Sequence, residues 1–281
     1  MSYYRLLNLK KEPFSTSPDP ALFYESDAHK AALYRLQVSI KLKRGLSLVL
    51  GDVGTGKTTL SRRLFQVLKK EKRVSSHLML NPFYENEDEF VGALLTLFKI
   101  QQEPGLLSVA ESLEAIERFL YEKSVTEKET VVLLIDEAQR LSPGALEVLR
   151  ALLNYETNEF KLLQLVLMGQ LELLPRLKEM KNFWDRISYG TMIAPLDIAD
   201  TEGMINFRMR EAGQSSRHSL FTPSAIQEIY RYSQGYPRRI TMICHDALEL
   251  LVLSGKRDVD ETIVNSVMGQ RLQLLDQHMA G

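Results

Sequence analysis

A run of glycines followed by a lysine and two threonines is the part of this sequence best suited to chemistry. In LSLVLGDVGTGKTTL, a short apolar stretch precedes Gly51, Gly54 and Gly56, and Lys57 and Thr58 then open a stretch with helical spacing. Glycines let backbone N–H groups turn inward around phosphates, and the N-terminus of the following helix adds positive potential. This spacing predicts a Walker A loop, which binds nucleotide phosphates between a strand and a helix.

The side chains of this loop have separate expected roles. Lys57 is expected to reach the β- and γ-phosphates, while the Thr58 hydroxyl ligates Mg²⁺. The expected cofactors are therefore ATP and Mg²⁺. The residues expected to line the phosphates are Gly51, Asp52, Val53, Gly54, Thr55, Gly56, Lys57, Thr58 and Thr59.

Two adjacent acids follow a second apolar run, in VVLLIDEAQ. In a parallel sheet, the carboxyl end of a neighbouring strand is where a carboxylate can face the phosphates. Asp136 would hold Mg²⁺ through coordinated water, and Glu137 would orient or deprotonate the attacking water. Many strands end in solvated acids, so the pair becomes specific only together with the phosphate loop. It then reads as a Walker B motif.

Alternating apolar and amphipathic stretches predict the elements that must position these residues. A parallel sheet covered by helices on both faces follows from repeated strand and helix units. Strands are expected at 46–50, 77–80, 131–135, 162–168 and 187–195. Helices are expected at 28–41, 58–70, 87–101, 108–123 and 142–155.

After Pro195 the strand patterns stop, and helices are expected at 200–211, 223–233, 237–253 and 261–275. A small all-α lid domain at 198–281 is therefore predicted behind an α/β nucleotide-binding domain at 46–197. The proline- and aromatic-rich segment at the start favours an ordered but irregular arm. We assign this arm and the first helix, residues 1–45, to the ATPase core.

Bulk composition favours a globular protein without a strong charge bias. Hydrophobic residues make up 44% and charged residues 25% of the 281 positions, and 35 basic residues nearly balance 36 acidic ones. Nothing in this balance argues for nucleic acid. The first residues lack the apolar core of a secretory signal, and no apolar run approaches a membrane span. We expect a cytoplasmic protein, peripheral at the inner membrane at most through a partner.

Five runs of sequence resemble the AAA+ ATPases, and within them the general secretion pathway protein A (ExeA-type) group. These runs are YYRLLNLKKEPFSTSPDPALFYES, GDVGTGKTT, LLIDEAQRLSPGALEVLRALLNYET, KLLQLVLMGQLEL and GYPRRI. The resemblance implies a P-loop NTPase (AAA+) core with a five-stranded parallel sheet and a helical lid. Better-known secretion members continue into a membrane span and a periplasmic wall-binding domain. This sequence ends at Gly281, so we expect either a stand-alone motor or switch that serves a membrane partner or a relative that works elsewhere.

The same resemblance implies roles for further residues outside the two motifs. Gln170 stands at the sensor 1 position, which contacts the γ-phosphate or the attacking water, although it could instead cap the following helix. Arg186 stands at the place of the arginine finger, which acts in the neighbouring subunit's site. Arg176 competes for that role, and a surface salt bridge is the plainer alternative for Arg186.

In the lid, Arg238 matches the sensor 2 arginine, with Arg239 as its neighbour and Pro237 helping to fix the local backbone. Both Pro237 and Arg238 are expected at the nucleotide. Adenine is expected in the region of Phe14, Ala28, His29 and Pro237.

Two functions remain open on the sequence alone. The leading one is an ATP-driven assembly factor for a secretion or pilus-type envelope machine, which oligomerises as a ring or filament, with a hexamer expected. The alternative is a transposition-type AAA+ regulator that polymerises on DNA. Basic residues that would suit DNA are Lys41, Lys43, Arg44, Arg62, Arg63, Lys69, Lys70, Lys72 and Arg73, but such clusters are usually solvated helix faces.

Overall fold

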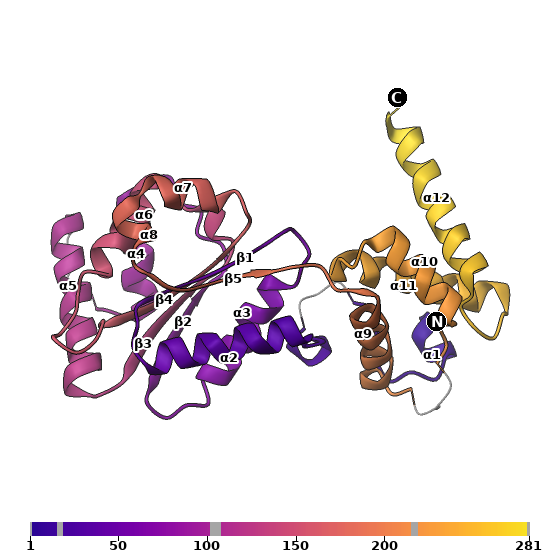
Figure 1. Cartoon of the computed structure of the whole chain (residues 1–281), viewed down its shortest axis with the longest axis horizontal. Helices are drawn as coiled ribbons and strands as arrows, with labels where there is room; N and C mark the ends of the chain where they lie inside the picture. The colour runs from indigo at the N-terminus through magenta and orange to yellow at the C-terminus, as the bar shows by residue number, and fades with distance from the viewer. Residues whose placement is uncertain (1, 16–18, 102–107, 215–218, 280–281) are drawn as a thin grey trace. The chain divides into compact units, whose positions relative to one another are not determined.

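The computed structural model describes residues 2–15, 19–101, 108–214 and 219–279, with side chains as far as residue 271. The chain divides into two compact units, whose elements are labelled in Figure 1. One comprises Asp27–Val53 and Lys57–Ile193, and we call it the α/β unit. The other comprises Met1–Ser26, Gly54–Gly56 and Ala194–Gly281, and we call it the helical unit.

The α/β unit is built on a five-stranded parallel sheet, which confirms the predicted fold class. The strand order is β2-β3-β4-β1-β5, and every pairing is parallel. Strand β4 therefore lies between β1 and β3, so the two motif-bearing strands are separated by one strand rather than adjacent. The strands are β1 (Leu46–Gly51), β2 (Val74–Met79), β3 (Thr130–Ile135), β4 (Leu163–Gly169) and β5 (Ile187–Ile193).

Helices cover both faces of the sheet because the central strands are apolar on both sides. Every residue of β1 and β4 is buried, as expected for strands of a covered parallel sheet. Leu48, Leu133 and Leu165 pack with α4 to α6 on one face. Helices α2 and α3 lie on the other face (Figure 1). The helices are α2 (Asp27–Lys41), α3 (Lys57–Leu68), α4 (Glu87–Phe98), α5 (Val109–Tyr121) and α6 (Pro143–Leu152).

Four short elements of this unit were not predicted from the sequence. They are the π-helix η2 (Glu122–Thr126), the 3₁₀ turn η3 (Ala138–Arg140), α7 (Leu173–Glu179) and α8 (Lys181–Trp184). Leu173, Leu177 and Phe183 are fully buried against the sheet core. Tertiary packing therefore stabilises helices that are too short to form on propensity alone.

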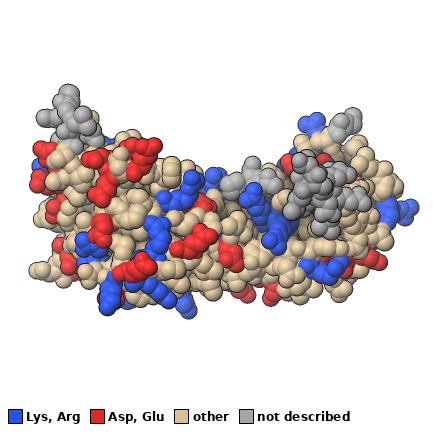
Figure 2. Space-filling model, turned by 90° about the horizontal axis from the view of Figure 1, so that it is seen from above, with Lys and Arg blue, Asp and Glu red and all other residues tan. Residues whose placement is uncertain are grey.

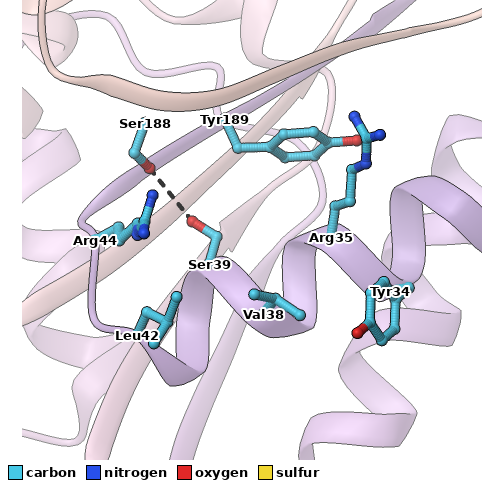
Figure 3. A pocket seen from close by; sticks show the side chains of 8 residues that line it. All are labelled: Tyr34, Arg35, Val38, Ser39, Leu42, Arg44, Ser188 and Tyr189. Atoms are coloured by element: carbon cyan, nitrogen blue, oxygen red, sulfur yellow. Dashed lines mark hydrogen bonds between the residues drawn. The ribbon is translucent and has the colours of Figure 1, made fainter.

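Hydroxyl groups join α2 to the edge strand β5 and to β1. Ser39 Oγ lies 3.3 Å from Ser188 Oγ, as Figure 3 shows, and the Ser47 hydroxyl donates to Ser39 Oγ at 3.1 Å. The Ser188 hydroxyl in turn donates to the Leu46 carbonyl at 2.8 Å. These bonds satisfy polar groups that α2 would otherwise bury without partners.

The helical unit packs the N-terminal arm against four longer helices, α9 (Ile198–Glu211), α10 (Pro223–Ser233), α11 (Pro237–Ser254) and α12 (Glu261–Met279). The arm includes the short helices α1 (Tyr3–Leu6) and η1 (Pro20–Leu22). Phe14 is fully buried in an edge-to-face contact with Phe221, with ring centroids 5.8 Å apart. Residues 1–26 thus group with the helical segment, and only the remainder of the predicted segment 1–45 belongs to the α/β unit. The arm's aromatic side chains decide this, because they pack in the helical unit's own core.

Candidate active site

The phosphate loop joins the end of β1 at Gly51 to the start of α3 at Lys57. Gly54 and Gly56 adopt φ angles of 84° and 101°, a left-handed region that favours glycine. The strand, the loop and the helix thus occur in the order that the sequence predicted. Val53 is 58% exposed. Its side chain therefore does not pack in the core, and the residue contributes its backbone to the loop.

Lys57 is folded back onto its own loop. Its Nζ donates to the carbonyl oxygens of Gly51 and Asp52, at 2.8 Å each, and the residue is only 5% exposed. Burial lowers the pKa of the Lys57 ammonium, while the nearby Glu137, Asp136 and Asp52 oppose that shift. The two acceptors of the ammonium are carbonyl oxygens, and a phosphate group would instead offer this cation a full negative charge.

Asp136 is the most costly buried polar group of the site. It follows β3, its backbone N–H donates to the Met79 carbonyl at 2.9 Å, and the residue is 1% exposed. Among the residues that the structure describes, neither of its carboxylate oxygens has a hydrogen-bond partner. Burial raises the pKa of Asp136, and the Glu137 charge adds to this shift, although the nearby Thr58 hydroxyl, the Glu137 backbone N–H and Lys57 favour the charged form.

These features fit a magnesium ion. Hard cations of this kind take oxygen ligands, and a buried carboxylate with two unpaired oxygens is a strong one. Thr58, in the first turn of α3, adds a hydroxyl from the phosphate loop. Thr58 and Asp136 are therefore the side chains that would hold Mg²⁺, and their metal-binding roles stay a prediction.

Glu137 stands directly after Asp136 in a left-handed conformation, with φ 53° and ψ 37°. Two amides reach its Oε2: Nε2 of Gln139 donates at 2.5 Å, and Nε2 of Gln170 donates at 3.5 Å. Gln170 follows β4, the strand between the two motif-bearing strands, so its side chain meets the Walker B acid directly. The structure thereby brings Gln170 and Glu137 together, while the sensor 1 role of Gln170 stays a prediction.

The two arginines that compete for the finger role differ in what they bind. Arg176 on α7 donates to the carbonyl oxygens of Gln139 and Leu141, at 2.8 and 2.5 Å. Arg186, just before β5, donates to the Asn182 carbonyl and to Asn154 Oδ1. Both arginines thus donate two hydrogen bonds within their own chain. The finger role of Arg186, with Arg176 as its competitor, stays a prediction. The sequence pattern did not indicate the contacts of Gln139 and Arg176.

In the helical unit, Pro237 is the first residue of α11 and Arg238 the second, where proline is favoured because its missing N–H is not needed. Arg239 lies over the ring of Tyr236, 4.9 Å from its centroid. The sensor 2 role of Arg238 stays a prediction. Phe14, considered for the adenine site, is instead a core residue of this unit. Within the described part of the chain, no helix is both long and apolar enough to cross a bilayer.

Comparisons with known proteins agree with this geometry. A family described as "AAA domain" matches residues 40–177. The fold also resembles Cdc6p from Pyrobaculum aerophilum, with a TM-score of 0.68 at 18% identity, covering 88% of this chain and 67% of that one. RuvB from Thermotoga maritima, a Holliday junction branch migration motor, gives a TM-score of 0.58 at 16% identity, covering 89% and 72%. The chain is an AAA+ P-loop protein.

Within that class the chain is related to the ExeA-type group. It is 38% identical over 250 residues to General secretion pathway protein A of Aeromonas hydrophila, a match that covers 88% of this chain. The chain spans 44% of the length of that relative.

Proposed function

We propose that this chain binds and hydrolyses Mg-ATP at subunit interfaces, and thereby drives or regulates assembly of a secretion or pilus-type envelope machine. The observation that carries the hydrolytic half is the buried carboxylate of Asp136 beside Lys57 and Thr58, whose pKa is raised by burial. Such an arrangement is costly unless a cation and phosphates complete it. The similarity to the Aeromonas protein supports the secretion half.

In the proposed mechanism, Lys57 binds the β- and γ-phosphates while Thr58 and Asp136 hold Mg²⁺. When bound, the ion neutralises charge on the phosphate oxygens. Glu137 accepts the proton of the attacking water, and Gln170 fixes that water or the γ-phosphate. Arg238 lets the helical unit respond to the γ-phosphate.

Assembly is the second part of the proposal. Arg186 acts in the neighbouring subunit's site, so turnover requires a ring or filament, with a hexamer expected. The protein then works in the cytoplasm, and it reaches the inner membrane through a secretion or pilus partner. Basic and acidic side chains are interspersed over the face shown in Figure 2, which suits a protein partner better than a polyanion.

An ATP-dependent DNA-binding transposition regulator is the alternative. Lys69, Lys70, Lys72 and Arg73 are exposed between α3 and β2, but Glu71 lies among them and pairs with Lys41 at 3.9 Å. Duplex binding that ATP strengthens and that falls steeply with salt would favour this alternative. Binding that is equally weak with and without ATP would exclude it.

The hydrolytic half is tested with Glu137→Gln. We expect this variant to bind Mg-ATP with near-normal affinity and to lose turnover by about 100-fold or more, because the water loses its base. Lys57→Ala should instead weaken binding itself. Glu179→Gln, at an exposed position on α7, is the matched control and should behave as wild type. Steady-state rates and calorimetry decide, and an unchanged rate in Glu137→Gln would remove Glu137 from the mechanism.

A further inference from the structure

The side chain of Gln139 joins the ends of β3 and β4 beside the candidate active site. It lies in η3, and its Nε2 donates to Glu137 Oε2 at 2.5 Å, while its Oε1 accepts the backbone N–H of Gln170 at 3.1 Å. A carboxylate only accepts and a backbone N–H only donates hydrogen bonds. Both contacts therefore require the same orientation of the amide.

Arg176 holds the backbone that carries this amide. Its planar guanidinium donates to the carbonyl oxygens of both Gln139 and Leu141. These two bonds connect the turn after β3 to α7. Gly169, the last residue of β4, allows the close approach. A Cβ there would lie 3.2 Å from Gln139 Oε1 and 3.0 Å from the Leu173 side chain.

We propose that Gln139 is a positioning residue for hydrolysis, anchored by Arg176, and that it aims the Glu137 carboxylate. The inference rests on the proposed function, in which Glu137 is the base. Oε2 of Glu137 accepts from both amides, which fixes the plane of the carboxylate and so orients Oε1 for the proton of water. Glu137 also occupies a left-handed backbone conformation that its surroundings must hold. Gln139 supplies that restraint and couples it to Gln170 at the tip of β4.

Kinetics of Gln139 variants test this role. In Gln139→Ala we expect kcat to fall by about 10- to 100-fold with little change in KM for ATP, since orientation and not binding is lost. Gln139→Glu places a second carboxylate against Glu137. The acidic limb of its pH–rate profile should therefore move to higher pH, by about one unit. Gln227→Glu, an exposed site on α10, is the matched control and should leave the profile unchanged.

A double-mutant cycle separates positioning from general support of the fold. In a Glu137→Gln background, Gln139→Ala should cause no further loss of turnover, because it acts through Glu137. The side-chain amide ¹⁵N–H resonance of Gln139 should also shift in Glu137→Ala but not in Glu179→Ala. An additive loss, an unmoved resonance or a wild-type pH profile in Gln139→Glu would overturn the inference.

Failure of the inference can be told apart from failure of the proposed function. If wild type hydrolyses ATP far faster than Lys57→Ala but the Gln139 variants match wild type, only the inference falls. If wild type is no faster than Lys57→Ala, the proposed hydrolysis falls, and the positioning role falls with it.

Discussion

Burial of the Asp136 carboxylate destabilises the ligand-free fold. The carboxylate is buried at the end of β3, and the nearby Thr58 hydroxyl and Lys57 offset the cost of its burial only in part. Because burial raises its pKa, the folded protein favours the protonated acid more than the unfolded chain does. This group therefore stabilises the fold most at low pH. That contribution is lost as the pH rises through the folded-state pKa of Asp136.

Asp136→Asn should therefore stabilise the ligand-free protein at neutral pH. We expect a gain of about 1–3 kcal/mol in unfolding free energy, since an uncharged amide replaces an unpaired buried charge. The gain should shrink as the pH is lowered, because wild-type Asp136 then takes up its proton. Urea unfolding without nucleotide measures both effects. Mg-ATP should raise the stability of wild type and not of the variant, and a ligand-free variant weaker than wild type at pH 7 would contradict this account.

At the scale of elements, the tip of β4 is a tightly fitted junction of the α/β unit. Gly169 ends this strand with little room for a side chain, since η3 lies on one side and Leu173 of α7 on the other. Because Gly169 has no side chain, the end of β4 packs against both η3 and α7. Any added atom must therefore push on both neighbours.

Gly169→Ala should destabilise the protein by about 1–3 kcal/mol and lower turnover, because the methyl group displaces Gln139 or Leu173. Gly92→Ala on α4 is the matched control. No atom lies within 4 Å of the Cβ position there, so the same change should stabilise by about 0.5–1 kcal/mol. Denaturant unfolding and steady-state rates of the pair give the comparison. Equal effects at the two positions would show that the β4 junction is not tightly packed.

Periodicity in the sequence predicted the long elements because each carries enough apolar residues to reveal its spacing. The helix predicted at 223–233 begins and ends as expected, at Pro223–Ser233. Helices α7 and α8 were missed since they span only 7 and 4 residues, and Pro175 within α7 reads as a breaker. Their stability comes from burying Leu173 and Phe183, which no local pattern records.

The candidate site was predictable in its motifs but not in its connections. The strand–loop–helix order around Lys57 and the acids after β3 follow from local sequence. The contact between Gln139 and Gln170 depends on β4 lying between β1 and β3, and strand order is a property of the whole sheet. The different contacts of Arg176 and Arg186 likewise could not be predicted, because they depend on where Gln139 and Asn154 lie in the folded chain.

At the scale of the whole molecule, the α/β unit carries both acids of the proposed site, and the finger is proposed to come from another copy. Arg176 donates to the backbone of the turn after β3, whereas Arg186 lies just before the edge strand β5 and donates to Asn154 and the Asn182 carbonyl. The proposed assembly would place Arg186 against a neighbouring copy.

Mixing two inactive variants tests whether Arg186 acts across a subunit boundary. Arg186→Ala should bind ATP yet hydrolyse it about 10³-fold more slowly than wild type. Adding Lys57→Ala chains should restore part of the turnover, because each intact finger can then serve an intact phosphate loop. Lys181→Ala, an exposed residue on α8, is a control that should need no complementation. Failure to recover any activity on mixing would place the finger elsewhere.

The stretch 170–186 has a consequence for timing. It begins at Gln170, whose amide contacts Glu137. It includes Arg176, which donates to the Gln139 carbonyl in η3, and it ends at Arg186. If Arg186 serves the next subunit as proposed, loss of the γ-phosphate in one copy would displace the arginine that acts in another copy's site. Successive copies would then hydrolyse ATP in order around the assembly, and residues 170–186 would couple each site to the next.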